Sequence, residues 1–249
     1  MNRRTAVREQ EKRVNIIIPI CMQNDFIGPK GVRSDREIAS LVLHGGARAS
    51  QKILGDADGS TPVDDLMEII HGNDQTYVIY IQDEHPDDPN DRTIQAHFQI
   101  FGKHCVAGTS GVKPVGRLQE FQRLRRSQVI TTDALNIVTH QPVVDAVTAI
   151  ITENEIDDSS QVKFMVLGGL TDVLVADCAR GFNHICGIPN PYRPDDQRWM
   201  FFTNVAVPER YTFSNNNTEH LSALRSMDKV AIKIPRTDAE IFSFLGIEA

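Results

Sequence analysis

The stretch VKFMVLGGLTDVLVADCARG, residues Val162 to Gly181, decides the fold of this chain. It opens with the apolar run Phe164 to Leu167, which is short enough to be a buried strand. Gly168-Gly169 end the run, and Thr171 is placed to cap a helix that begins at Asp172. The stretch therefore predicts a strand, a tight turn and a helix, and open α/β sheets place ligands and nucleophiles at such a corner.

The first turn of this predicted helix carries no nucleophile. A helix amino terminus lowers the pKa of a thiol, so a reactive cysteine would be expected there. Leu174 stands in that place instead. Cys178 follows four residues later, where we expect a small, buried core residue.

Composition bounds the class of protein. The 249 residues, 41% of them hydrophobic, are enough for one α/β domain, and the net charge of -7 makes a nucleic-acid surface unexpected. No segment resembles a transmembrane span or a secretory signal, so we expect no membrane partner. The four cysteines lack paired spacing, which predicts an intracellular, reducing compartment and leaves the organelle open. We expect residues 1–13 to form a flexible basic tail and residues 14–249 a single domain.

Apolar runs alternate with helical periodicity along the chain. The predicted strands are Val14 to Ile20, Thr76 to Ile81, Gln128 to Thr132, Phe164 to Leu167, Met200 to Val207 and Lys229 to Ile234. The predicted helices are Arg36 to Leu54, Thr61 to Gly72, Val115 to Arg126, Gln141 to Glu155, the helix from Asp172, His220 to Met227 and Thr237 to Leu245. Pro19 is expected to interrupt the first strand near its end. This alternation predicts a three-layer α/β/α fold with a six-stranded, mainly parallel sheet.

A candidate metal site follows the second predicted strand. Asp83 and His85 alternate along an extended segment, so both side chains can point at one place. With His104 they supply two imidazoles and one carboxylate, which suit zinc or another divalent first-row metal. The alternative is structural, with Asp83 and His85 capping loops and His104 buried and hydrogen-bonded.

Cys21 ends the first predicted strand and is a candidate nucleophile. No histidine or lysine stands predictably beside it, and a lone buried cysteine is more often an inert apolar residue. Asp25 and Asp172 could act as bases, although residues at such positions more often make turns and caps.

Four motifs, in order, resemble the isochorismatase-like hydrolase (cysteine hydrolase) family, and above all its nicotinamidase branch. The first two are Cys21-Met22-Gln23-Asn24-Asp25-Phe26, where the family has Asp-x-Gln-Asn-Asp-Phe, and Asp83-Glu84-His85-Pro86. The others are His104-Cys105-Val106-Ala107-Gly108-Thr109-Ser110-Gly111 and Gly168-Gly169-Leu170-Thr171-Asp172-Val173-Leu174-Val175, where the family has cysteine at the seventh place. The resemblance covers Val14 to Leu245 and implies the fold of that family.

The resemblance also implies roles for single residues. Enzymes of this family hydrolyse amides with an aspartate base, a lysine and a cysteine nucleophile, and these positions hold Cys21, Thr131 and Leu174, so no catalytic residue is intact. The metal set Asp83, His85 and His104 is kept. The pocket would be lined by Gln23, Asp25, Gly169, Leu170 and Thr171.

Two functional hypotheses follow. The first is a pseudoenzyme without amidase activity that binds a metal or a small amide-like ligand, or serves as a structural subunit. The second is an active hydrolase of a small amide or related C–N bond, in which Cys21 supplies the thiolate or a metal-activated water attacks. Since the family often forms oligomers, the resemblance implies a homo-oligomer or a subunit of a larger complex.

Overall fold

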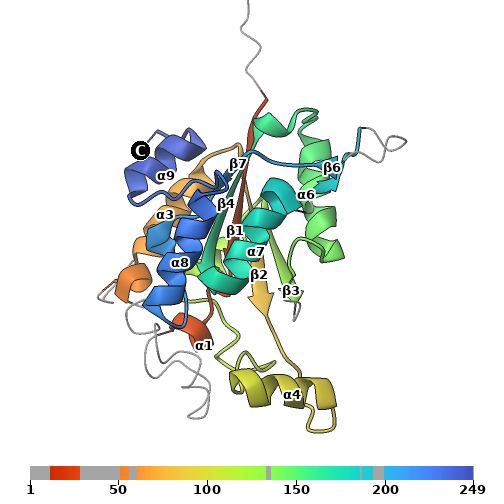
Figure 1. Ribbon diagram of the computed structural model, residues 1–249, viewed down its shortest axis with the longest axis vertical. Helices are drawn as coiled ribbons and strands as arrows, with labels where there is room; N and C mark the ends of the chain where they lie inside the picture. Colours follow the sequence, from red (N-terminus) through yellow and green to blue (C-terminus); the bar gives the residue numbers. More distant parts are fainter. Residues whose placement is uncertain are drawn as a thin grey trace, which may run out of the picture.

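The computed structural model describes residues 12–28, 51–55, 61–132, 136–185, 187–192 and 199–248. Its main sheet is built from six parallel strands (Figure 1). These strands are β1 (Val14–Ile20), β2 (Thr76–Asp83), β3 (Ser127–Thr132), β4 (Val162–Gly169), β7 (Asn204–Ala206) and β8 (Thr212–Phe213). Their order is β3-β2-β1-β4-β7, and β8 pairs with the last residues of β4. The expected six-stranded, mainly parallel α/β sheet is confirmed.

The central strand β1 is buried along its whole length, which explains its unbroken apolar sequence. Its register with β4 runs without a gap from Val14 to Ile20, whereas its register with β2 omits Ile18 and Pro19. A proline has no N–H to give to a ladder. The interruption expected near Pro19 is therefore confirmed on the β2 side.

The last two predicted strands are wrong in part. The run from Met200 to Val207 divides into β6 (Trp199–Met200), which pairs antiparallel with β5 (Ile188–Pro189), and the short β7. The run Lys229 to Ile234 makes only an isolated bridge between Lys233 and Ala206. The run follows directly on helix α8, which ends at Asp228. Within it, Ala231 takes a φ of +65°, which is incompatible with a strand.

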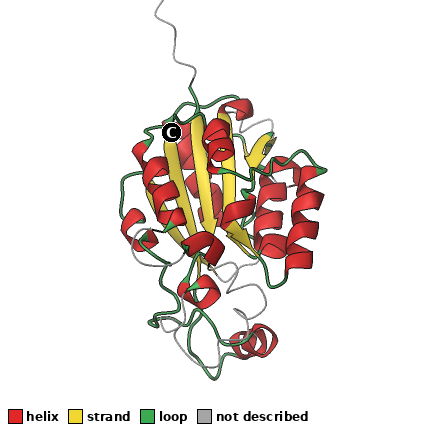
Figure 2. Cartoon of the chain, turned by 90° about the vertical axis from the view of Figure 1, so that its left-hand side faces the viewer, coloured by secondary structure: helices red, strands yellow, loops and turns green. Residues whose placement is uncertain are grey.

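Helices cover both faces of the sheet (Figure 2). The longer ones are α3 (Pro62–Gly72), α4 (Arg92–Phe101), α6 (Gln141–Glu153), α8 (Asn217–Asp228) and α9 (Asp238–Leu245). Capping boxes start two of them, Thr61 with Asp64 at α3 and Thr237 with Glu240 at α9. None of the described helices is long and apolar enough to cross a membrane.

Several helical predictions need correction. The predicted helix Val115 to Arg126 is only the single turn α5 (Leu118–Phe121), and the non-helical φ angles of Gly116 (+54°) and Arg126 (+65°) lie on either side of it. A further helix, α4, is not among the predicted ones, and Asp91 caps it by accepting from the N–H groups of Thr93 and Ile94. In Figure 1, α4 stands apart from the sheet.

The helix after β4 also begins differently from the prediction. It has a wide π-helical first turn, η3 (Thr171–Val175), then α7 (Ala176–Arg180) and a second π-helical turn, η4 (Gly181–Ile185). Thr171 is inside the helix and caps nothing, because its hydroxyl donates to the carbonyl of Phe213. Cys178 is fully buried, as expected.

Some predictions fall outside the described residues. These are most of the tail 1–13, most of the helix Arg36 to Leu54, of which residues 51–54 are helical, and Asp133. The division into a tail and one domain stays a prediction.

Candidate metal centre

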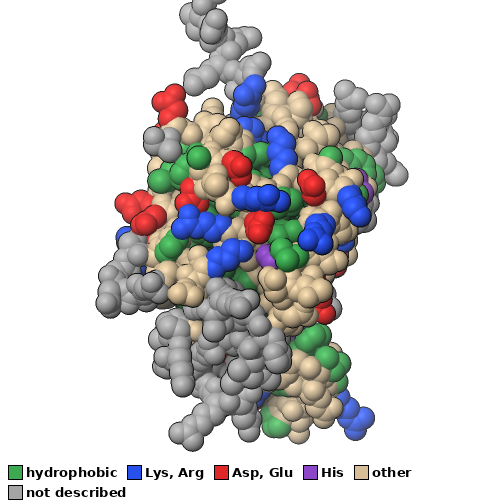
Figure 3. All heavy atoms as spheres, turned by 60° about the vertical axis from the view of Figure 1, so that its left-hand side comes forward, with side chains coloured by type: hydrophobic (Ala, Val, Ile, Leu, Met, Phe, Trp, Pro, Cys, Tyr) green, Lys and Arg blue, Asp and Glu red, His purple; other side chains and the backbone are tan. Residues whose placement is uncertain are grey.

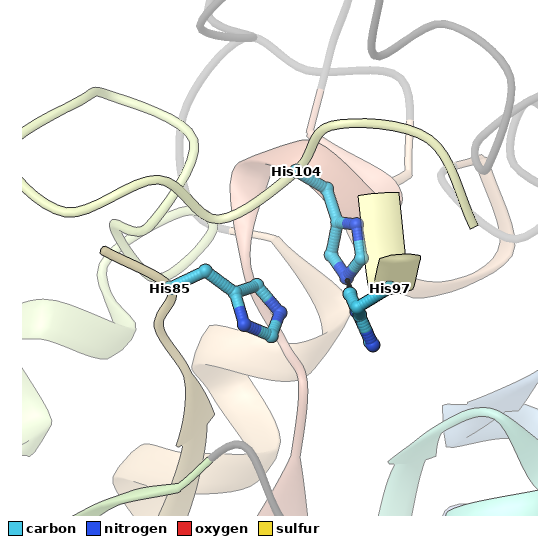
Figure 4. Close-up of side chains that lie close together, drawn as sticks. All are labelled: His85, His97 and His104. Atoms are coloured by element: carbon cyan, nitrogen blue, oxygen red, sulfur yellow. Dashed lines mark hydrogen bonds between the residues drawn. The ribbon is translucent and has the colours of Figure 1, made fainter. Parts of the chain in front are cut away.

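Four side chains from three segments converge at the carboxyl end of β2. Asp83 is the last residue of β2 and His85 lies two residues further, so both project to the same side. His97 comes from the second turn of α4 and His104 from the loop after it. Figure 4 shows the rings of His85, His97 and His104 facing one another across a small space.

The distances define a compact cluster. The carboxylate of Asp83 lies 3.1 Å from Nε2 of His85 and 3.1 Å from Nε2 of His104. Nε2 of His97 lies 3.5 Å from Nε2 of His104. Each histidine offers a ring nitrogen within 4.8 Å of the others. Three imidazoles therefore lie together, and the carboxylate of Asp83 contacts two of them.

The tautomer of His104 is set by its backbone. Nδ1 of His104 lies 2.7 Å from the carbonyl oxygen of Gly102, and a carbonyl can only accept, so Nδ1 carries the proton. The other ring nitrogen, Nε2, faces the carboxylate of Asp83 and Nε2 of His97. A histidine held this way by a carbonyl is the usual arrangement of a metal ligand, because the tautomer and the ring orientation are both fixed.

The cluster lies inside the protein. His85 is 1% exposed and His104 is 2% exposed, and Nδ1 of His85 is buried without a hydrogen-bond partner among the described residues. Burial raises the pKa of Asp83, but hydrogen bonds with His104 and His85 outweigh it and lower the pKa to about 2. The cluster thus keeps a carboxylate ionised among imidazoles.

This donor set fits a divalent first-row metal. Zinc binds histidine nitrogen and carboxylate oxygen at 2.0–2.2 Å, which places neighbouring tetrahedral ligands about 3.3 Å apart. The measured separations of 3.1 to 3.5 Å bracket that value.

An aromatic shell encloses the imidazoles. The ring of Phe26 lies 5.5 Å from His104, that of Phe98 lies 5.5 Å from His85, and that of Phe101 lies 4.8 Å from His97, measured between centroids. Apolar rings limit the access of water and lower the local dielectric constant, which strengthens charge–ligand interactions.

Gln23 positions Asp83. Its Oε1 accepts from the Asp83 N–H at 2.9 Å, and its Nε2 donates to the carbonyls of Asp83 and Val112, both at 2.8 Å. Gln23 is 1% exposed, so these bonds have no competition from water. It acts as a support of the site rather than as a surface that a ligand touches.

Asp25 fixes the loop that carries His104. Its Oδ2 accepts from the backbone N–H of Cys105 at 2.9 Å, next to His104. The loop is also tied to His85, whose N–H donates to the carbonyl of Cys105, while the N–H of Ala107 donates to the carbonyl of His85. One segment, Gln23 to Asp25, thereby fixes both Asp83 and the loop of His104.

The three positions that the resemblance aligned with a catalytic triad, Cys21, Thr131 and Leu174, lie at or after the ends of three strands of the sheet. Cys21 follows β1, Thr131 is exposed on β3 beside Gln82, and Leu174 is half-buried in η3. Burial, and next the charge of Asp83, raise the pKa of the Cys21 thiol well above its usual value. A neutral, buried thiol is a poor nucleophile.

The remaining predicted pocket residues form a packed corner. Thr171 is fully buried, donates to the carbonyl of Phe213 at 2.7 Å and accepts from Nδ1 of His220 at 3.0 Å. A Cβ on Gly169 would lie 2.2 Å from the ring of Phe213. Leu170 is half-buried and packs against the core. The structure brings these residues together, but as interior packing around Phe213.

The sequence analysis missed His97. The signal that could have found it is its place in the second turn of a capped amphipathic helix that ends three residues before His104. Its contact with the other imidazoles depends on the direction of α4, which sequence periodicity does not give.

Comparison with known proteins finds relatives in structure alone. No protein-family model matches the chain, and no curated protein sequence does. An isochorismatase-like hydrolase of Alkaliphilus metalliredigens matches with a TM-score of 0.60 at 18% identity, over 93% of this chain and 99% of that one. The pyrazinamidase of Pyrococcus horikoshii, solved in complex with zinc, matches with a TM-score of 0.54 at 17% identity, over 90% and 99%. The yeast nicotinamidase matches with a TM-score of 0.54 at 12% identity, over 90% of this chain and 100% of that one.

These matches establish the fold. The chain has the isochorismatase-like α/β fold, a fold that hydrolases with nicotinamidase activity share. Identities of 12% to 18% carry no statement about the reaction of this chain.

Proposed function

We propose that this protein binds one divalent metal ion, zinc by preference, through Asp83, His85, His97 and His104, and that it lacks the cysteine-dependent amidase reaction of its structural relatives. The observation that carries the proposal is the convergence of three imidazoles, whose ring nitrogens lie within 4.8 Å of one another, with the carboxylate of Asp83 3.1 Å from Nε2 of His85 and from Nε2 of His104. The buried, unpartnered Nδ1 of His85 and the fixed ring orientation of His104 support it.

The loss of the amidase reaction rests on the residues where the nucleophile and its base would be needed. Leu174 has no group that can attack a carbonyl, and Thr131 has no positive charge. Cys21 supplies no thiolate, because burial raises its pKa. Members of such a unit act together, so the positions that are kept do not replace those that are lost.

The metal would have a structural role. Four protein donors complete the tetrahedral shell that zinc prefers, as in structural zinc sites. The ion would join the end of β2, helix α4 and the loop of His104, and the free energy of binding would stabilise this part of the fold. Lewis-acid chemistry needs an open coordination position, so a complete shell of four protein donors would give the ion a structural role.

Metal titration tests the first half of the proposal. Metal-free protein, prepared with a chelator, is titrated with Zn²⁺ by calorimetry, and we expect one ion per chain. His97→Gln and His104→Gln should each weaken binding by about 100-fold, because each removes a ligand. The exposed His184 offers a matched control, and His184→Gln should leave affinity unchanged. Wild-type affinity in the His104→Gln variant would overturn the proposed site.

An activity assay tests the second half. Zinc-loaded wild type should release no ammonia from nicotinamide, while the Leu174→Cys, Cys21→Asp, Thr131→Lys triple variant should gain weak turnover. Turnover by wild type that Cys21→Ala abolishes would establish the alternative hydrolase with a relocated nucleophile. Turnover that survives Cys21→Ala and disappears with the metal would establish a metal-dependent hydrolase. The amide-like ligand and the oligomer stay predictions, and size-exclusion chromatography with light scattering tests the latter.

A further inference from the structure

A groove lies between α8 and α9, at the edge of the sheet opposite the metal centre. Lys163, the second residue of β4, is at its base, whereas the metal centre follows the carboxyl end of β2. The groove encloses about 1040 Å³. Figure 3 looks onto this side of the molecule, where Lys and Arg side chains gather with carboxylates between them.

Two lysines meet over one aromatic ring in this groove. Nζ of Lys163 lies 5.7 Å and Nζ of Lys233 lies 5.2 Å from the centroid of Phe244. Burial lowers the pKa of Lys163, and the nearby charges of Arg13 and Lys233 lower it further. Arg225 of α8 adds a third cation to the lining. These like charges repel one another, so the arrangement favours a bound anion.

The carboxylates of the groove do not balance these charges. Glu240 accepts from the backbone N–H groups of Arg236 and Thr237 in the capping box of α9. Glu209 lies 3.4 Å from Nε of Arg236. Asp228 is the third carboxylate of the lining, and among the described residues neither Lys163 nor Lys233 forms an ion pair with a carboxylate. With Arg236 the lining holds four cations against three carboxylates, so the groove has an excess of one positive charge in a protein whose net charge is -7.

The floor of the groove is apolar. Leu224 is 4% exposed and Phe244 is 8% exposed, and Ile234 lies beside them. A ligand with an apolar body could bury it here while its charged group meets the two ammonium groups, as small-molecule sites commonly combine an apolar lining with a few polar anchors.

We propose that the groove between α8 and α9 binds a small organic dianion with an apolar body, of which an aryl phosphate is the simplest form, through Lys163, Lys233 and Arg225. Charge-assisted hydrogen bonds from the two lysines would hold the dianion, and the floor of Leu224 and Phe244 would hold the apolar body. The site is independent of the metal centre and of the proposed function.

Calorimetric titration of the metal-free full chain tests this site. Phenyl phosphate, phthalate and inorganic phosphate are the probes, each at constant ionic strength. We expect saturable binding of phenyl phosphate, weaker binding of inorganic phosphate, and a loss of affinity of about tenfold or more in the Lys163→Gln, Lys233→Gln double variant. Binding of phthalate as tight as that of phenyl phosphate would assign the site to dicarboxylates as well, within the same proposal.

A matched variant controls for general charge. Lys229 is exposed at the end of α8 and outside the groove, so Lys229→Gln should keep the affinity of wild type. Thermal unfolding of each variant shows that it is folded. The proposal is overturned if phenyl phosphate shows no saturable binding to wild type, or if the double variant binds as wild type does. An equal loss in Lys229→Gln would also overturn it.

Discussion

The side chain of Gln23 pairs with the backbone of Asp83 as a neighbouring strand would, with Oε1 accepting at 2.9 Å and Nε2 donating at 2.8 Å. The same Nε2 donates to the carbonyl of Val112 at 2.8 Å, so one amide fixes two segments. Asp83 carries the carboxylate at the centre of the candidate metal site. The segment after β1 therefore controls the position of a ligand that belongs to β2.

This relationship predicts the effect of Gln23→Glu. A buried carboxylate cannot donate to the carbonyls of Asp83 and Val112, so we expect a loss of about 3 kcal/mol in the free energy of unfolding. Zinc affinity should fall by about tenfold or more, because the orientation of a ligand is lost. Denaturant unfolding and zinc titration measure the two effects. Gln128→Glu, on the exposed side of β3, should change neither, and equal effects of both variants would contradict the assignment.

Gly111→Ala should disturb the same site through Asp25. A Cβ at Gly111 would lie 1.8 Å from Oδ2 of Asp25, which accepts from the N–H of Cys105. We expect a loss of about 2 kcal/mol in the free energy of unfolding. Gly72 is the control, since a Cβ there meets nothing within 4 Å. Gly72→Ala should change stability by less than about 1 kcal/mol, and a tolerated Gly111→Ala would show that Asp25 does not fix this loop.

Stability should fall in mild acid because of His220. Burial, and next the charge of Lys52, lower its pKa from 6.5 to about 4. The unfolded chain therefore binds a proton between pH 6.5 and 4 that the folded chain does not bind. Neutral His220 therefore contributes about 2 kcal/mol to the free energy of unfolding. This contribution is complete above pH 6.5 and is lost as the pH falls toward 4.

The His220→Gln variant isolates this contribution. The pKa of His71 is likewise lowered to about 4, mainly by burial, so His220→Gln should flatten the pH dependence without removing it. Urea unfolding of the metal-free protein from pH 7 to pH 4 measures the slope. His184→Gln should keep the slope of wild type, and an unchanged slope in His220→Gln would contradict the prediction.

The native protein should resist thiol reagents. Cys21, Cys105 and Cys178 are at most 3% exposed, and burial raises the pKa of all three. In a Cys186→Ser background, which removes the cysteine outside the described residues, we expect no labelling by a disulfide reagent until the protein unfolds. Fast labelling of Cys21 in the native protein would instead favour the relocated nucleophile.

The sequence predicted the part of the site that local geometry controls. Asp83 and His85 alternate on an extended segment, so their common direction follows from the backbone period alone. The cap at Thr61 and the capping box of Thr237 with Glu240 depend only on neighbouring residues, and both are present. In contrast, the run Lys229 to Ile234 has the composition of a strand but makes one bridge, because its first residues form the turn that ends α8 and Ala231 takes a φ of +65°.

By itself, the sequence determined the apolar runs of β1, β2 and β4, hence a parallel sheet with polar residues at its carboxyl edge, because burial on both faces needs such runs. Only the tertiary structure decided that His97 joins the metal cluster, that Gln23 supports Asp83 rather than lining a pocket, and that the hydroxyl of Thr171 binds Phe213. The physical reason is that these contacts join segments far apart in the chain. Their distances depend on how helices and loops pack, and no local periodicity encodes that packing.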